Sequence, residues 1–107
     1  MPANIGEIVF SRNRDIWEPP AQAQLQKVLL RLQKESTGRV SIEAYAGPDE
    51  TRPSELASQR AEAVKRYLVQ NGVAESRVQT MVGLGGKRGG LRNRTIDVIW
   101  LPKGLEY

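Results

Sequence analysis

The apolar positions of the chain change their period several times, and these changes divide the sequence into elements. The apolar run Ile5–Phe10 is typical of a short strand, and it stops at a polar cluster over 11–15. From Ala21 the apolar residues recur at the spacing of one helix face, which predicts an amphipathic helix that ends at Ser36–Gly38. The residues of this face are Leu25, Val28, Leu29 and Leu32.

The middle of the chain repeats this change of period. Val40–Tyr45 alternates apolar and polar side chains, which indicates a half-buried strand. The two prolines of Gly47–Pro53 predict a loop. A second helix is expected from about Ser54 to Gln70, closed by Asn71–Gly72. Its apolar stripe consists of Ala57, Ala61, Val64 and Leu68, with Leu56, Ala63 and Tyr67 beside it.

Two further strands are expected in the last third of the chain, at Arg77–Val82 and Thr95–Leu101, with a glycine-rich basic loop between them. The order strand, helix, strand, helix, strand, strand predicts an α/β fold in which helices pack on one sheet. A length of 107 residues fits one domain over residues 1–107, with 1–4 and 102–107 as flexible ends.

Composition removes several classes of chemistry. The chain has no cysteine and no histidine, so it offers no thiol nucleophile, no serine–histidine pair and no zinc site built on those ligands. The carboxylates Asp49, Glu50 and Glu55 show no acid–base pairing pattern, and solvated loop charges explain them better than catalysis. We therefore expect a protein that is not an enzyme and needs no metal and no cofactor.

The net charge of +4 allows an anionic partner, although such an excess commonly serves solubility alone. The loop Gly83–Gly90 is not a phosphate-binding loop, because Lys87 is followed by Arg88 and not by serine or threonine. The basic residues Lys87, Arg88, Arg92 and Arg94 could contact phosphates, but the few strand aromatics form no stacking platform. Nucleic acid is therefore not the expected partner.

No stretch approaches the roughly 20 apolar residues of a transmembrane helix, and Met1–Gly6 does not resemble a signal peptide. If the protein is exported, the sequence corresponds to one domain or a mature fragment. Any membrane attachment is then expected from parts of a parent protein outside this chain.

Arg60 is the most informative charged residue. Its spacing from Leu56, Ala63 and Tyr67 places it at the edge of the apolar stripe, with its head directed at the loop end of the sheet. Two interpretations remain open from the spacing. The side chain either extends over the core towards solvent or forms a bidentate clamp for a carboxylate.

Several segments resemble one known family in the correct order. Leu56–Val73 followed by Arg77 and Val78 resembles the central signature of OmpA-like domains. Val40–Tyr45 resembles the strand before their binding loop, and Asn93–Val98 resembles their closing strand. Ile8–Phe10 corresponds to the opening strand, so the resemblance covers nearly the whole chain.

The resemblance implies a two-layer sandwich of βαβαββ order, a mixed four-stranded sheet with helices on one face. It also implies a function, since the family holds peptidoglycan without cutting it and includes outer-membrane proteins, peptidoglycan-associated lipoproteins and flagellar stator subunits. Its ligand is diaminopimelate of the peptide stems, whose ammonium pairs with an aspartate and whose carboxylate pairs with an arginine. A periplasmic location, in a protein attached to the outer or inner membrane, is implied as well.

Arg60 falls on the family's arginine, but the family's aspartate falls on Gly47. The usual asparagine and serine near the second helix fall on Pro53 and Ala57, and Ser11 and Arg12 stand where many members have an acidic residue. The expected ligand-binding residues are Arg60, Asp49, Tyr45, Gly47 and Glu50.

This chain therefore has the family's arginine, as Arg60, but lacks its aspartate, whose position is Gly47. An ammonium left without its carboxylate would cost about 2–5 kcal/mol in a buried site. Either Asp49 or Glu50 substitutes for the missing aspartate, or the domain no longer binds peptidoglycan. In the second case we expect a scaffold that binds other envelope proteins in a secretion, motility or conjugation machine.

Overall fold

The computed structural model describes residues 3–45, 52–82 and 94–101. The described elements follow the expected βαβαββ order, and the starts of the first helix and the last strand agree with the sequence pattern. They are β1 (Ala3–Val9), α1 (Ala21–Lys34), β2 (Arg39–Ala44), α2 (Pro53–Gln70), the 3-10 turn η1 (Glu75–Arg77), β3 (Val78–Val82) and β4 (Thr95–Leu101). Within these ranges, neither helix combines the length and the apolarity that crossing a bilayer requires.

The opening strand differs from the expectation. Ala3 and Asn4 were expected in a flexible end, but they pair with Trp100 and Ile99 of β4. The ladder is irregular between Asn4 and Gly6, where the Asn4 side chain accepts a 3.1 Å hydrogen bond from the Gly6 N–H. Phe10 lies outside β1 and forms an isolated bridge with Trp17.

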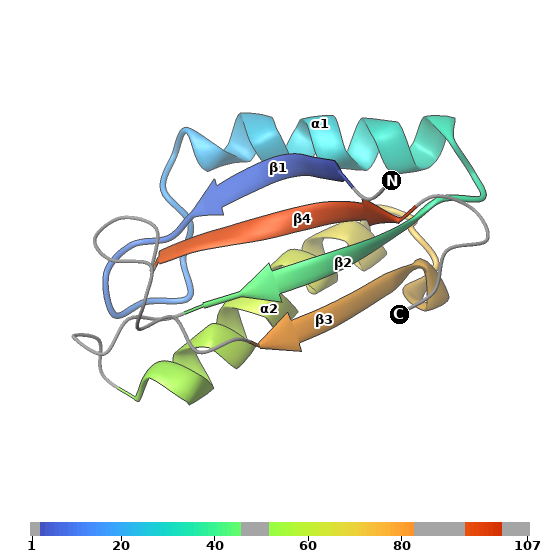
Figure 1. The fold of residues 1–107 in the computed structure, drawn as a ribbon. Helices are drawn as coiled ribbons and strands as arrows, with labels where there is room; N and C mark the ends of the chain where they lie inside the picture. The colour runs from blue at the N-terminus through green and yellow to red at the C-terminus, as the bar shows by residue number, and fades with distance from the viewer. Residues whose placement is uncertain (1–2, 46–51, 83–93, 102–107) are drawn as a thin grey trace.

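The strands form one mixed sheet in the order β1-β4-β2-β3. β4 runs antiparallel to both β1 and β2, whereas β2 and β3 are parallel. The carboxyl ends of β1, β2 and β3 therefore meet at one end of the sheet, and α2 begins near that end (Figure 1). Connections that leave this end bring together residues that are far apart in the sequence.

Both helices pack on the same face of the sheet and form one core with it. The Cα of Gly6 lies so close to α1 that a β-carbon there would meet Val28 at 2.8 Å. The register places Gly6 opposite Val98, and Val98 opposite Ile42 of β2, so these residues share the helix-covered face. The central part of the core consists of Ile8, Leu25, Val28, Leu32, Val40, Ile42, Ala61, Val64, Leu68, Ile96 and Val98.

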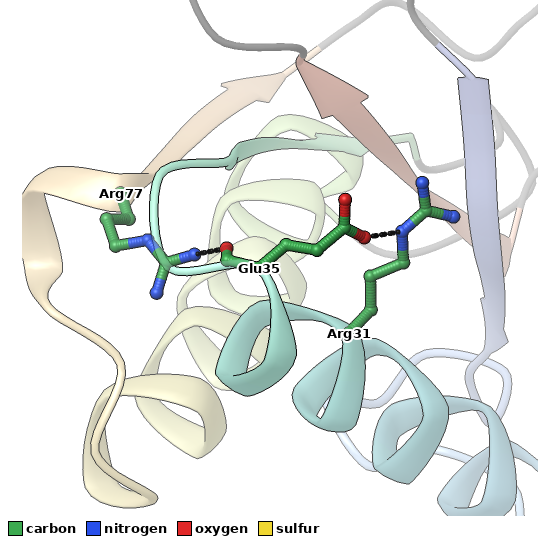
Figure 2. Close-up of polar contacts among 3 residues, drawn as sticks. All are labelled: Arg31, Glu35 and Arg77. Carbon is green, nitrogen blue, oxygen red and sulfur yellow. Dashed lines mark hydrogen bonds and ion pairs between the residues drawn. The ribbon is translucent and has the colours of Figure 1, made fainter.

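Arg77, which is far from α1 in the sequence, donates hydrogen bonds to the chain at the end of this helix. Arg77 of η1 donates from Nε to the carbonyl of Gly38 at 2.8 Å and from Nη2 to the carbonyl of Glu35 at 2.6 Å. The carboxylate of Glu35 accepts from Nε of Arg31 at 2.8 Å (Figure 2). The guanidinium of Arg77 satisfies the carbonyl of Glu35, the residue that caps α1, and its charge suits the negative end of the helix dipole.

Candidate ligand-binding site

Arg60 lies two turns inside α2 and is fully buried, with 0% of its surface exposed. The helix begins with Pro53, whose fixed φ suits a first helical position. Arg60 is three residues after Ala57 and four before Val64, and both of those are buried. The spacing from these two residues places it on the core side of α2. The expectation of a partly exposed arginine at the stripe edge is therefore wrong.

Among the described residues, three backbone carbonyls accept hydrogen bonds from the guanidinium. Nε donates to the carbonyl of Arg14 at 3.0 Å, and Nη2 donates to that of Ser11 at 3.0 Å. Nη1 donates to the carbonyl of Tyr45 at 3.4 Å. The first two acceptors belong to the loop after β1 and the third directly follows β2. Arg60 thus joins these two chain segments to α2 at the loop end of the sheet.

The surroundings of Arg60 suit a permanent positive charge. Its guanidinium carbon lies 5.6 Å from the centroid of the Phe10 ring, within cation–π range. The carbonyl acceptors supply partial negative charge, and hydrogen bonds from an ionised donor are stronger than neutral ones. The guanidinium of Arg60 therefore places a positive charge at the loop end of the sheet. The contact to Tyr45 is the longest of the three and hence the weakest.

The structure brings together two of the five expected site residues, Arg60 and Tyr45. Tyr45 is half-buried and contributes its main-chain carbonyl to the contact with Arg60. The other three, Gly47, Asp49 and Glu50, lie outside the described residues.

Positions that differ from the family's usual residues have structural roles here. Ala57 is a fully buried core residue, and Pro53 is the first residue of α2. Ser11 contributes a backbone carbonyl to Arg60, so its side chain does not decide this contact. Arg14 was not expected in the site, because a carbonyl acceptor can come from any residue type.

The described residues do not form a metal centre, since no three histidine, cysteine or acidic side chains among them gather in a group that could hold an ion. The exposed carboxylate of Glu55 lies 3.7 Å from Nη1 of Arg52 on the surface.

Comparison with known proteins places this geometry in context. The model of the OmpA family matches residues 9–99. No curated protein matches the chain. The fold is similar to the OmpA-like domain of FopA1 from Francisella tularensis, with a TM-score of 0.76 and 16% identity over 87% of this chain and 68% of that one.

Two further solved structures show the same fold. The peptidoglycan-associated lipoprotein from Burkholderia pseudomallei has a TM-score of 0.76 and 23% identity over 90% of each chain. The periplasmic domain of Helicobacter pylori MotB has a TM-score of 0.71 and 15% identity over 92% of this chain and 70% of that one. Since the family model covers most of the sequence and the βαβαββ sandwich agrees with these structures, the chain belongs to the OmpA family.

Proposed function

We propose that this domain associates non-covalently with peptidoglycan in the periplasm, as a module of a cell-envelope protein and without catalysis. Membership of the OmpA family supports this, as does the likeness in fold to a protein named peptidoglycan-associated lipoprotein and to a periplasmic domain of MotB. The observation that carries the proposal is the position of Arg60, a buried guanidinium at the loop end of the sheet beneath Ser11, Arg14 and Tyr45.

Arg60 would bind the carboxylate of diaminopimelate in the peptide stem. Among the contacts to described residues, the one from Nη1 to the Tyr45 carbonyl is the longest, at 3.4 Å against 3.0 Å for the other two, so this is the contact that a ligand would displace most easily. A carboxylate forms a stronger, charge-assisted bond with a guanidinium than a carbonyl does. Because Arg60 is completely buried, the ligand has to move the chain around it, and this opening weakens binding.

The ammonium of diaminopimelate requires a carboxylate, and we assign this role to Asp49, with Glu50 as the other candidate. The family's aspartate position is Gly47 in this chain. If neither acid reaches the ligand, the loss is about 2–5 kcal/mol, which weakens binding by about 30-fold to several thousand-fold.

A second candidate function is a scaffold that binds other envelope proteins and no longer holds peptidoglycan. The contacts of Arg60 favour it, because Nε, Nη1 and Nη2 each donate to a main-chain carbonyl and thereby stabilise the loop after β1. In this candidate the arginine is kept for folding and not for recognition.

Isothermal titration separates the two candidates. The wild-type domain is titrated with a muropeptide that contains diaminopimelate and with the matched muropeptide that contains lysine, which lacks the second carboxylate. Cell-wall association predicts binding of the first ligand and at least about tenfold weaker binding of the second. It also predicts weaker binding of the first ligand by Asp49→Asn or by Glu50→Gln. Equal affinities, or no heat from a folded domain, would favour the scaffold.

A further inference from the structure

The strand β3 lies at one edge of the sheet (Figure 1). In the part of the chain that the structure describes, β3 pairs with β2 on one side and with no strand on the other. An edge strand leaves a row of backbone donors and acceptors that can pair with a further strand. Met81 and Val82 of this strand are also 48% and 49% exposed, although both are large and apolar. β3 therefore offers backbone groups and apolar surface at the same edge.

The two edges of the sheet are built differently. β1, at the opposite edge, contains the charged Glu7, and its ladder is irregular between Asn4 and Gly6. Charges and bulges are two of the devices by which natural sheets prevent their edges from pairing. β3 has the sequence Val-Gln-Thr-Met-Val, with no charged residue and no proline. Of the two edges, β3 is the one that is suited to accept another strand.

The charged residues that lead into β3 are engaged elsewhere. A carboxylate oxygen of Glu75 in η1 lies 3.4 Å from Nζ of Lys65, so these two charges balance each other. Arg77, which directly precedes β3, donates to the carbonyls of Glu35 and Gly38 at the end of α1. Neither Lys65 nor Arg77 therefore directs an uncompensated charge at a strand that pairs with β3.

The sequence of β3 is complementary to itself in one antiparallel register. Residues that stand opposite each other in such a pair must turn their backbone groups the same way, so a twofold axis passes through a residue. An axis at Thr80 pairs all five residues of β3, because Gln79 then faces Met81 of the other copy and Val78 faces Val82. An axis at Gln79 or Met81 would pair only three. Thr–Thr pairs are favourable across strands, valine fits a pleated surface well, and no like charges meet in this register.

We propose that two copies of this chain pair antiparallel through β3, about a twofold axis at Thr80, and join their four-stranded sheets into one continuous sheet. An axis perpendicular to the sheet keeps α2 of both copies on the same face. Closed twofold symmetry is also the commonest arrangement of soluble homo-oligomers.

The dimer is expected to be weak. Five residues from each copy form a small interface, and the net charge of +4 on each copy opposes association. The inference does not depend on cell-wall association, because no residue of β3 belongs to the set assigned to diaminopimelate.

A single introduced thiol tests the register directly, since the chain has no cysteine. In Thr80→Cys the two thiols would face each other across the axis, where the Cα atoms of an antiparallel pair are about 4.5–5.5 Å apart and a disulfide can form. Val82→Cys is the matched control. Val82 is 49% exposed, but its copy would lie four residues further along the partner strand, about 14 Å away. Under mild oxidation we expect Thr80→Cys to form a covalent dimer at least about tenfold faster than Val82→Cys.

Sedimentation velocity measures the reversible dimer. The sedimentation coefficient of the wild-type domain should rise between about 0.05 and 1 mM, and it should rise further at high salt, which screens the repulsion between the copies. Thr80→Lys places like charges opposite each other and should weaken association at least about tenfold, whereas an equal mixture of Thr80→Lys and Thr80→Glu should restore it. Gln26→Lys adds the same charge at an exposed position of α1 and should change the affinity by less than about threefold. Thermal denaturation verifies that the variants are folded.

Several outcomes would overturn the proposal. Equal cross-linking of the two cysteine variants contradicts the register, and a constant sedimentation coefficient up to about 1 mM contradicts the dimer. Failure of the two folded Thr80 variants to associate when mixed contradicts the pairing across the axis. Protection of every β3 amide from hydrogen exchange in a dilute, monomeric sample would show that another segment of the same chain occupies this edge.

Discussion

Replacing Arg60 by lysine should destabilise the domain strongly. The structure shows three hydrogen bonds from the guanidinium to main-chain carbonyls, and a lysine ammonium on a flexible stem cannot reproduce their fork geometry. If the lysine keeps one bond, two are lost in a fully buried place. Hydrogen bonds to charged groups contribute about 1.5–3 kcal/mol each, so the loss of two bonds in Arg60→Lys should lower the free energy of unfolding by about 3–6 kcal/mol.

Urea denaturation followed by circular dichroism measures this change, and the melting temperature should fall by at least about 12 °C. Arg66→Lys is the matched control, because Arg66 is an exposed arginine on the same helix and its replacement should change stability by less than about 0.5 kcal/mol. Hydrogen exchange should accelerate in the loop of residues 11–17 in Arg60→Lys. A loss of stability below about 1 kcal/mol, with unchanged hydrogen exchange in that loop, would refute the claim that Arg60 stabilises the loop after β1.

Two further substitutions test the packing at the end of α1. Arg77→Met removes the hydrogen bonds to the carbonyls of Glu35 and Gly38. The free energy of unfolding measured in urea should fall by about 1–3 kcal/mol, and a fall under about 0.5 kcal/mol would show that these two hydrogen bonds contribute little to stability. Gly38→Ala places a β-carbon where it would overlap ring carbons of Trp100, so a loss of about 1–3 kcal/mol and an altered near-ultraviolet tryptophan signal are expected. Wild-type values of both would contradict the packing described.

Most helices and strands were predictable because the periodicity of apolar residues is contained within each segment. The start of α1 at Ala21 and the bounds of β4 at Thr95–Leu101 agree with the periodicity of the sequence, and α2 begins one residue earlier than expected. The opening strand was predicted less well. Ala3 and Asn4 are held by pairing with β4, and such a long-range contact leaves no mark on the local pattern.

The site was predictable only in part. The placement of Arg60 at the loop end of the sheet agrees with its position on the second helix, but its complete burial does not. The signal was present in the small Ala57 three residues earlier and the apolar Val64 four residues later, which place Arg60 on the core side of α2. Its acceptors could not be foreseen, since backbone carbonyls are the same in every residue.

The contact between Arg60 and the Tyr45 carbonyl distinguishes the two candidate functions, peptidoglycan binding and a scaffold for other envelope proteins. Nη1 of Arg60 makes its longest contact with the Tyr45 carbonyl, and this is the contact that a ligand carboxylate would replace. Displacement of this carbonyl should leave the bonds to Ser11 and Arg14 in place.

The most direct measurement is the guanidinium signal of Arg60 itself. In the 15N-labelled domain, titration with a diaminopimelate-containing muropeptide should shift the Nε–H resonance of Arg60 and the amide of Tyr45 in a saturable manner, while the matched lysine-containing muropeptide should not. If both resonances stay unchanged at millimolar muropeptide in a folded domain, Arg60 serves the fold alone and the proposed cell-wall association is contradicted.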